Sequence, residues 1–399
     1  MSQTSVDTTH LMATYKRPDV RFVSGSGCHL LDDQGRRYLD FLSGIAVVSL
    51  GHAHPAVSAA IGAQAGKLLH VSNLFHNELA EPVAARLDWM VGDGEPAGGK
   101  VFFANSGAEA NECAIKLARR FGGRGRHVVV SAYGGFHGRT LATLHATGQP
   151  EKHEPFAPMP DGFRHAAYGD IGAFEAAASS DVAAVLVEAI QGEAGVIVPP
   201  AGFLRELRQL CDERAMLLIL DEVQTGLART GRWFGFQHEE IRPDVVTLAK
   251  ALGNGMPAGA CWARAEVAEV FGPGDHGSTF GGQPIALSAV RATLEEMVAI
   301  DAPARARHAG ARLQGGLSHL KGVAATRGAG LLLAAVLEEG LDAPEIAHRA
   351  LEAGLVINAP ARSVLRFAPP LIVSDEEIDD ALGRLESVLG GARSRRSAS

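Results

Sequence analysis

A lysine and an aspartate follow two short apolar runs and could act together on a charged ring. Lys250 comes after the run Val245–Leu248, and Asp221 ends the run Leu217–Asp221. Lysine is rare here, because only seven of the 37 basic residues are lysines, so a lysine at the end of an apolar run is conspicuous. A partly buried amine beside a cation has a lowered pKa and becomes a nucleophile. A carboxylate at a buried strand end can pair with a protonated ring nitrogen.

Two polar loops add groups that suit a phosphate and a flat ring. Ser106, Gly107 and Ala108 follow another apolar run and open a helical pattern, in which Ser106 and Glu109 form an S-x-x-E capping box. Backbone N–H groups at such a helix start suit a dianionic phosphate, and Phe136 offers a face for stacking. Each motif alone has an ordinary structural explanation, since Ser-Gly-Ala also serves as an N-cap and a strand-end aspartate as an ion-pair partner.

The combination is specific where the single motifs are not. Pyridoxal phosphate needs an amine that holds it as a Schiff base, a carboxylate that keeps its ring nitrogen protonated, and a phosphate cup. Lys250, Asp221 and the Gly107–Ala108 turn supply these three groups. The sequence therefore predicts an enzyme that uses pyridoxal phosphate.

Alternating strand and helix patterns must position these motifs. Apolar residues from Ala110 to Phe121 recur at i, i+3, i+4, i+7, i+8 and i+11, which predicts a helix with one buried face. Buried strands are predicted over 101–104, 127–131, 182–188, 217–221 and 245–248. This order favours an α/β fold with a parallel sheet, in which ligands bind beyond the carboxyl ends of the strands.

The sequence pattern changes after about Gly282. Helices are predicted over 285–300, 302–320 and 343–352, with strands over 331–337 and 364–367. We expect a large domain over 51–285, a small α+β domain over 286–392, an N-terminal arm over 1–50 that joins the small domain, and a disordered tail over 393–399.

Composition and charge exclude several classes of protein. Apolar residues make up 46% and charged residues 21% of the chain, as in ordinary globular proteins. The net charge of −8 opposes a nucleic-acid surface, no apolar run is long enough for a bilayer, and the polar first ten residues form no secretory signal. Four scattered cysteines indicate buried reduced thiols, and His52-Ala53-His54 indicates a structural pair with no metal. We expect a cytoplasmic enzyme without nucleic-acid or membrane partners.

Longer motifs around the same residues make the chain similar to class III aminotransferases of fold type I. The similarity extends from Leu39–Phe41 to Leu365–Leu371 and includes GHAHP (51–55), HVSNLFHNE (70–78), NSGAEANE (105–112), GGFHGRT (134–140), EAIQGEAGV (188–196), DEVQTGLARTG (221–231), TLAKALGNG (247–255) and HGSTFGG (276–282). The resemblance implies a large domain built on a mostly parallel seven-stranded sheet, pyridoxal 5'-phosphate as cofactor, and a homodimer with a shared active site.

The resemblance also implies roles for the cofactor site. Lys250 would be the Schiff-base lysine and proton shuttle, Asp221 the partner of the pyridinium, and Gln224 a hydrogen-bond donor to the phenolic oxygen. Phe136 and Val223 would enclose the ring. The remaining cofactor contacts would come from Ser106, Gly107, Ala108, Glu188 and, from the second subunit, Thr279.

Two arginines would bind the substrates. Arg139 is expected to bind the α-carboxylate of an acylated ornithine in one half-reaction and the side-chain carboxylate of glutamate in the other. Arg366 would hold the α-carboxylate of glutamate or 2-oxoglutarate, and Glu193 would pair with Arg366 when a donor with a neutral tail is bound. Ser278 of the second subunit would lie near the substrate.

Ile45 bears on the choice of donor, because related ornithine δ-aminotransferases carry a tyrosine there. Ile45 and the stretch Ser72–Phe75 favour the acetylornithine branch: N2-acetyl-L-ornithine and 2-oxoglutarate would give N-acetyl-L-glutamate 5-semialdehyde and L-glutamate, a step of arginine biosynthesis. Succinylornithine, ornithine or GABA as donor, and an aminomutase of the same fold, stay open. Ser49, Ala189 and Gln283 depart mildly from the family pattern.

Overall fold

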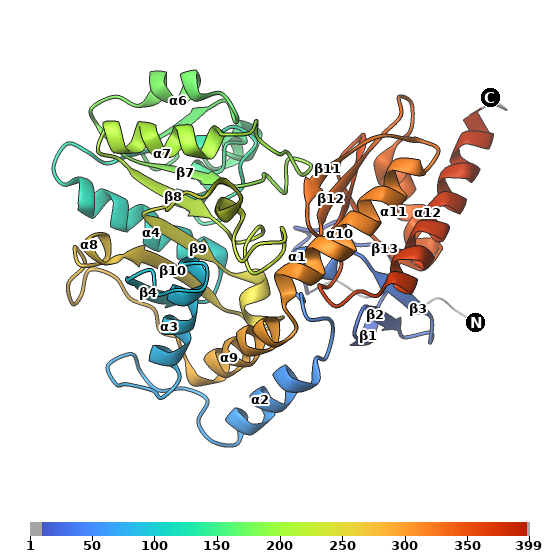
Figure 1. Cartoon of the computed structure of the whole chain (residues 1–399), viewed down its shortest axis with the longest axis horizontal. Helices are drawn as coiled ribbons and strands as arrows, with labels where there is room; N and C mark the ends of the chain where they lie inside the picture. The colour runs from blue at the N-terminus through green and yellow to red at the C-terminus, as the bar shows by residue number, and fades with distance from the viewer. Residues whose placement is uncertain (1–9, 397–399) are drawn as a thin grey trace.

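The computed structural model describes residues 10–396, with side chains up to 392, and is built on a seven-stranded sheet (Figure 1). The strand order is β4-β10-β9-β8-β7-β5-β6, in which β10 runs antiparallel to both neighbours and the other pairs are parallel. The mostly parallel seven-stranded sheet of the prediction is therefore confirmed. The strands are β4 (Gly99–Ala104), β5 (Val128–Ala132), β6 (Phe163–Ala166), β7 (Val182–Glu188), β8 (Leu217–Asp221), β9 (Val245–Leu248) and β10 (Gly259–Arg264).

Helices cover both faces of this sheet, which explains why its central strands are apolar throughout. Every residue of β5, β7, β8 and β9 is buried. Alternate residues of these strands join two separate apolar clusters, one with α4 (Gly107–Gly122) and the other with α7 (Phe203–Glu213). The remaining helices of this part are α2 (Pro55–Ala65), α3 (Ala80–Val91), α5 (Leu141–Ala146), α6 (Ile171–Ala177) and α8 (Ala265–Ala268), and the short helix α1 (Ser43–Ala46) precedes them.

Helix α4 begins at the predicted N-cap. The Ser106 hydroxyl accepts the Glu109 N–H at 3.2 Å. The Glu109 carboxylate accepts the backbone N–H of Asn105 at 2.7 Å, one residue before the position that a reciprocal capping box would use. The helix start is therefore satisfied from both sides, and the first N–H groups of α4 stay available to a ligand.

The second half of the molecule carries two four-stranded sheets (Figure 1). One has the order β1-β2-β3-β13, so the N-terminal strands pair with a strand from residue 355 onward. The other has the order β11-β12-β15-β14. Their bounds are β1 (Phe22–Ser26), β2 (His29–Asp32), β3 (Arg37–Asp40), β11 (Val323–Ala329), β12 (Leu332–Leu337), β13 (Leu355–Val356), β14 (Asn358–Ala361) and β15 (Val364–Phe367).

Four long helices complete the chain: α9 (Pro284–Ala299), α10 (Ala302–His319), α11 (Ala343–Glu352) and α12 (Asp375–Arg396). The first three agree with the predicted helices to within one residue, whereas α12 was not predicted and runs past residue 393, where the tail was expected to begin. Residues 393–396 belong to this helix, whereas 397–399 lie outside the described residues. The helix continues past Gly390 and Gly391 because Leu385 and Leu389 are buried and hold it against the core.

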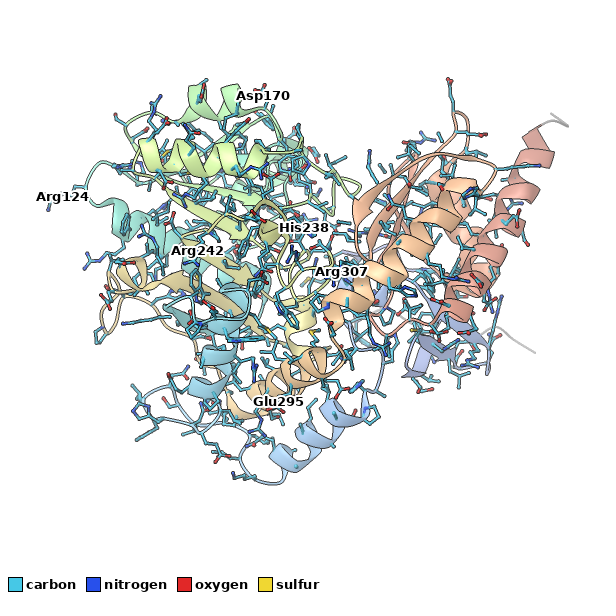
Figure 2. The ribbon with its side chains drawn as sticks, in the orientation of Figure 1. Arg124, Asp170, His238, Arg242, Glu295 and Arg307 are labelled. Atoms are coloured by element: carbon cyan, nitrogen blue, oxygen red, sulfur yellow. The ribbon has the colours of Figure 1, made fainter. Side chains whose placement is uncertain are left out.

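The two halves meet around the loop that follows β8. Arg229 on this loop is 1% exposed and donates to the carbonyls of Leu331 and Pro369 and to the Ser49 hydroxyl. Burial lowers its pKa to about 9. Figure 2 shows His238 and Arg307 at the same junction, and the Arg307 guanidinium donates to the Gly231 carbonyl at 2.7 Å. Arginine–carbonyl contacts therefore tie three distant segments together.

Other sequence predictions concern single residue types. All four cysteines are buried and none forms a disulfide. The His52 ring lies 2.7 Å from an Asp40 oxygen, and the His54 ring lies 4.0 Å from a Glu296 oxygen, so each imidazole faces a carboxylate of its own chain. Within residues 10–396, no helix combines the length and the apolar character that a membrane span requires.

Helix α10 approaches the β11–β12 turn at a glycine, and this contact predicts a stability effect. A Cβ at Gly310 would lie 2.1 Å from the Gly330 carbonyl oxygen, whereas a Cβ at Gly315 of the same helix meets nothing within 4 Å. Gly310→Ala should lower the free energy of unfolding by about 1–3 kcal/mol because the helix must move outward. Gly315→Ala should raise it by about 0.4–1 kcal/mol. Urea unfolding followed by circular dichroism compares the two, and equal stabilities would contradict the close approach.

Candidate active site

A cavity of about 420 Å³ opens at the carboxyl ends of the parallel strands. Its lining brings together most of the predicted site: Ser106, Gly107, Ala108, Phe136, Arg139, Glu188, Glu193, Asp221, Val223, Gln224 and Lys250. It is the position that an open α/β sheet predicts for a ligand. Residues from five loops therefore converge on one cavity, as the sequence indicated.

Lys250 lies just past the end of β9, as the first residue of the short 3-10 helix η4 (Lys250–Gly253). Its φ of 46° is in the left-handed region, which a residue with a side chain adopts only where the surrounding structure enforces it. Burial, together with the nearby Arg366 cation, lowers the pKa of the Lys250 amine to about 8, although Glu193, Asp221 and Glu188 act in the opposite direction. About a tenth of this amine is therefore neutral and nucleophilic at pH 7, far more than for an ordinary lysine.

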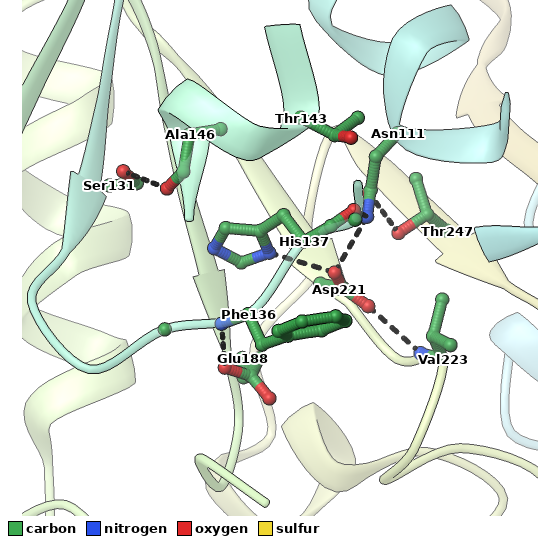
Figure 3. Close-up of polar contacts among 12 residues, drawn as sticks. Asn111, Ser131, Phe136, His137, Thr143, Ala146, Glu188, Asp221, Val223 and Thr247 are labelled. Atoms are coloured by element: carbon green, nitrogen blue, oxygen red, sulfur yellow. Dashed lines mark hydrogen bonds and ion pairs between the residues drawn. The ribbon is translucent and has the colours of Figure 1, made fainter. Parts of the chain in front are cut away.

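Asp221 ends β8 and is held by three donors (Figure 3). Its Oδ2 accepts the Asn111 amide at 2.7 Å and His137 Nδ1 at 2.8 Å, and its Oδ1 accepts the Val223 N–H at 3.1 Å. Because a carboxylate only accepts, the proton of His137 is on Nδ1. Thr247 on β9 donates to the Asn111 oxygen at 2.7 Å and so orients the amide. The network fixes a buried, charged carboxylate at the floor of the cavity.

Asn111 and His137 are site residues that the sequence analysis did not single out. Both lie inside motifs that it quoted, Asn111 on the second turn of α4 and His137 directly after Phe136. Asn111 occupies a helix position that periodicity alone assigns to the core. A buried polar residue on an otherwise apolar helix face was the available signal.

Glu188 ends β7 and organises the loop that carries Phe136. Its carboxylate accepts the Phe136 N–H at 3.0 Å and the Gly192 N–H at 3.4 Å. Burial raises the pKa of Glu188 to about 7. Gly192 leaves room for Gln224, because a Cβ there would overlap the Gln224 side-chain oxygen as it lies in the structure. Glu188 therefore positions the aromatic side chain that lines the cavity.

Arg366 on β15 forms an ion pair with Glu193 directly behind the cavity. One guanidinium nitrogen, Nη1, lies 2.6 Å from Glu193 Oε1 and also donates to the Gly192 carbonyl at 3.1 Å. Nε donates to Asn358 at 3.1 Å. Burial alone would raise the pKa of Glu193, but the Arg366 cation outweighs it and the pKa is lowered. Arg366 is 1% exposed, so the pair neutralises a cation that water does not reach.

Two buried donors, one lining the cavity and one directly behind it, have no partner within the described chain. They are Gln224 Nε2 and the second terminal nitrogen of Arg366, Nη2. Unsatisfied buried donors are rare and costly, so such groups indicate a missing ligand. Gln224 would meet an acceptor in the cavity, and Arg366 would meet a carboxylate.

Ile45, Ser278, Thr279 and Arg366 are the predicted site residues that do not line the cavity. Ile45 lies in α1 with a φ of 67°, and Val47 of the same segment lines the cavity instead. The Ser278 hydroxyl accepts the Asn105 amide at 3.2 Å and the Gly281 N–H at 2.9 Å. Thr279 is exposed. Thr279 lies outside the cavity of its own subunit, and its contact with a phosphate in a second subunit stays a prediction.

A family model described as aminotransferase class-III matches residues 12–389. The chain is a class III aminotransferase. It is 48% identical over 388 residues to an acetylornithine aminotransferase from Gloeobacter violaceus, covering 95% of each chain. It is 47% identical to one from Methanopyrus kandleri, covering 96% of this chain and 97% of the other.

Solved structures of this family share the fold. An N-acetylornithine aminotransferase from Stenotrophomonas maltophilia superposes with a TM-score of 0.83 at 34% identity, over 96% of this chain and 98% of that one. An ornithine aminotransferase from Toxoplasma gondii, whose structure shows partial occupancy of pyridoxal phosphate at its active site, superposes with a TM-score of 0.92 at 34% identity, over 98% of this chain and 94% of that one. The fold is fold type I, and the enzyme is a transferase that depends on pyridoxal phosphate.

The residues of this class III aminotransferase fit that cofactor. Gln224 Nε2 is a buried donor without a partner, and the Gly107 and Ala108 N–H groups open α4 where a phosphate binds helix termini. A Cβ at Gly107 would lie 3.0 Å from the Val223 side chain, so the glycine leaves space between helix and loop. Lys250 supplies the amine and Asp221 the carboxylate that the cofactor ring requires.

The lowered pKa of Lys250 predicts how the cofactor-free enzyme takes up pyridoxal phosphate. Only the neutral amine attacks an aldehyde, so the uptake rate should rise with pH and reach half its plateau near pH 8, rather than near the value of about 10.4 for an ordinary lysine. Absorbance at several pH values measures the rate. In Glu193→Gln the midpoint should move to lower pH, because the charge of Glu193 favours the ammonium. A wild-type midpoint above pH 10 would contradict the prediction.

Proposed function

We propose that the enzyme transfers the δ-amino group of N2-acetyl-L-ornithine to 2-oxoglutarate, giving N-acetyl-L-glutamate 5-semialdehyde and L-glutamate, in arginine biosynthesis. The Glu193–Arg366 pair is the observation that carries this proposal. An enzyme with two different donors must present a carboxylate-binding arginine to one and mask it from the other, and a paired Glu193 masks it. The names of the relatives at 44–48% identity support the choice of donor.

Arg139 would bind the end of the donor that carries the α-carboxylate. It is exposed at the cavity, its guanidinium lies 5.5 Å from the Phe136 ring centre, and it forms no ion pair within the described residues. A free planar guanidinium binds a carboxylate through two parallel hydrogen bonds and so fixes its orientation. Donor and oxo acid would both use it, at different ends of their chains.

The residues around Lys250 would move the proton that transamination requires. Bound pyridoxal phosphate supplies a protonated ring that withdraws electrons from the reacting carbon, and Asp221 keeps that ring protonated. Gln224 Nε2 would donate to the phenolic oxygen of the ring. The Lys250 amine, released by the incoming donor, would take the proton from the donor carbon and return it on the cofactor side. Its pKa near 8 suits both accepting and releasing a proton at neutral pH.

We also propose a homodimer, in which Thr279 of one copy reaches the phosphate bound by the other and Ser278 lies near its substrate. Large apolar side chains are exposed beside these residues, among them Leu74 at 87%, Phe75 at 68% and Phe280 at 64%. Asn73 donates to the carbonyls of Ser278 and Gly281, so the two segments form one surface. A patch of this kind is typical of an interface between subunits.

We further propose a cytoplasmic location and domain boundaries at residues 50, 285 and 392.

Donor choice is tested on the holoenzyme without 2-oxoglutarate. N-acetyl-L-ornithine should convert the absorbance band of the enzyme-bound cofactor within one turnover, whereas ornithine and GABA should convert it at least about tenfold more slowly, since their tails leave polar groups unmatched. Stopped-flow absorbance measures each rate, and Lys250→Ala, which lacks the amine, is the control. Faster conversion by ornithine or GABA would keep the enzyme class and refute the acetylornithine proposal.

The masking role of Glu193 predicts a change in preference. Glu193→Gln leaves Arg366 without its carboxylate, so the ratio of kcat/KM for glutamate to that for acetylornithine should rise by about tenfold or more. Both half-reactions are measured in single turnovers. Glu193→Asp keeps the charge and should restore part of the original ratio. An unchanged ratio in Glu193→Gln would remove the mask from the mechanism.

A further inference from the structure

A second cavity, of about 530 Å³, adjoins the active site. The two cavities share Phe136, Arg139 and Glu193. The far wall of the second cavity comes from Gln149 and the 3-10 helix η1 (Pro150–Lys152). Any substituent that a substrate carries beside a carboxylate bound to Arg139 is therefore next to this space.

Lys152 is held on this wall by a chain of contacts. Gln149 donates from its amide to the carbonyls of Gly134 and Gly135, at 3.4 and 3.0 Å, which fixes its side-chain oxygen. The Lys152 ammonium donates to that oxygen. The Lys152 N–H also bonds the Gln149 carbonyl at 2.9 Å. The ammonium is therefore held in place before any ligand arrives, which reduces the entropy lost on binding.

The charge of the second cavity favours an anion. Glu193 is already neutralised by Arg366. The acid closest to Lys152 is Glu151, whose carboxylate lies 3.8 Å away and is 71% exposed, so solvent screens it. Arg139, on the shared wall, has no ion pair within the described residues. Arg139 and Lys152 thus carry two positive charges that the exposed carboxylate of Glu151 compensates only weakly, and a ligand with two carboxylates could pair with both cations.

We infer that this cavity receives the N-acyl group of the donor, and that Lys152 selects acyl groups that end in a carboxylate, of which succinyl is the simplest probe. The inference rests on the proposed function. With the α-carboxylate on Arg139, the acyl nitrogen is attached to the same carbon, so the acyl chain leads away from the reacting amine. An acetyl group ends within this space, whereas a succinyl group extends several bonds farther and brings its carboxylate toward Lys152. A lysine is a compact charge that tolerates some variation in geometry.

The test compares N-succinyl-L-ornithine with N-acetyl-L-ornithine on the holoenzyme, in single turnovers at several donor concentrations. In Lys152→Gln the succinyl-to-acetyl ratio of kcat/KM should fall about fivefold, the worth of a partly exposed charge pair, through a higher KM for the succinyl donor. Lys152→Arg keeps the charge and should restore most of the ratio. Glu151→Gln removes the opposing charge of the same cavity and should raise the ratio.

Salt separates charge recognition from shape. Raising the ionic strength should lower the succinyl-to-acetyl ratio of the wild type and leave that of Lys152→Gln almost constant. A ratio that Lys152→Gln does not change, while acetylornithine still reacts, would overturn the inference and leave the proposed function standing. A wild type that converts neither acylated donor but converts ornithine would overturn both.

Discussion

The central constraint on this enzyme is that several ionisable side chains are buried together at one edge of the sheet, where their positive and negative charges must compensate one another. Lys250 and Arg366 are cations there, and Asp221, Glu188 and Glu193 are carboxylates. Burial disfavours the charged form of each group, which is why the pKa of Lys250 is lowered to about 8 and that of Glu188 is raised to about 7. The pKa of Lys250 depends on several charged neighbours at once, and no single one of them determines it. In the proposed reaction, the carboxylate of a bound substrate would add to this set of charges.

The fold supports this balance by making the surrounding backbone rigid. Four central strands are buried along their whole length, so the residues just beyond their ends cannot shift without disturbing the core. Asp221 and Lys250 follow neighbouring strands, β8 and β9, and Thr247 on β9 reaches Asp221 through Asn111. Arg366 lies on β15, in the other half of the molecule. Arg229, on the loop after β8, donates to the carbonyl of Pro369, which follows β15 closely, and so connects the two halves. The second arginine thus owes its position to a contact between the two halves.

The sequence predicted those parts of the site that local pattern controls. Lys250, Asp221 and the Gly107–Ala108 turn were predictable because each ends or begins a regular element, and the bounds of the three helices predicted after Gly282 agreed to within one residue. His137 and Asn111 were not singled out, because their importance comes from a shared partner that lies 84 and 110 residues further along the chain. Helix α12 runs to Arg396, beyond the expected start of the tail at 393, for a related reason: buried Leu385 and Leu389 outweigh the two glycines that follow them. In these three cases, contacts between residues that are brought together by the fold determine the role or the helix end, and local sequence propensity does not.

The backbone fold does not separate the donors that the relatives of this family are named for, so side chains must contribute to donor selection. The chain superposes more closely on an ornithine aminotransferase, at 0.92, than on an N-acetylornithine aminotransferase, at 0.83, although its relatives at 44–48% identity carry the acetylornithine name. One scaffold thus accepts donors that differ by an acyl group. The acyl group removes the positive charge of the α-nitrogen and adds volume. In the proposed binding mode both changes would be felt at the wall formed by Gln149, Glu151 and Lys152. A few side chains on a short segment outside the sheet can then change the donor while the charge balance around Lys250, on which the chemistry depends, is left intact.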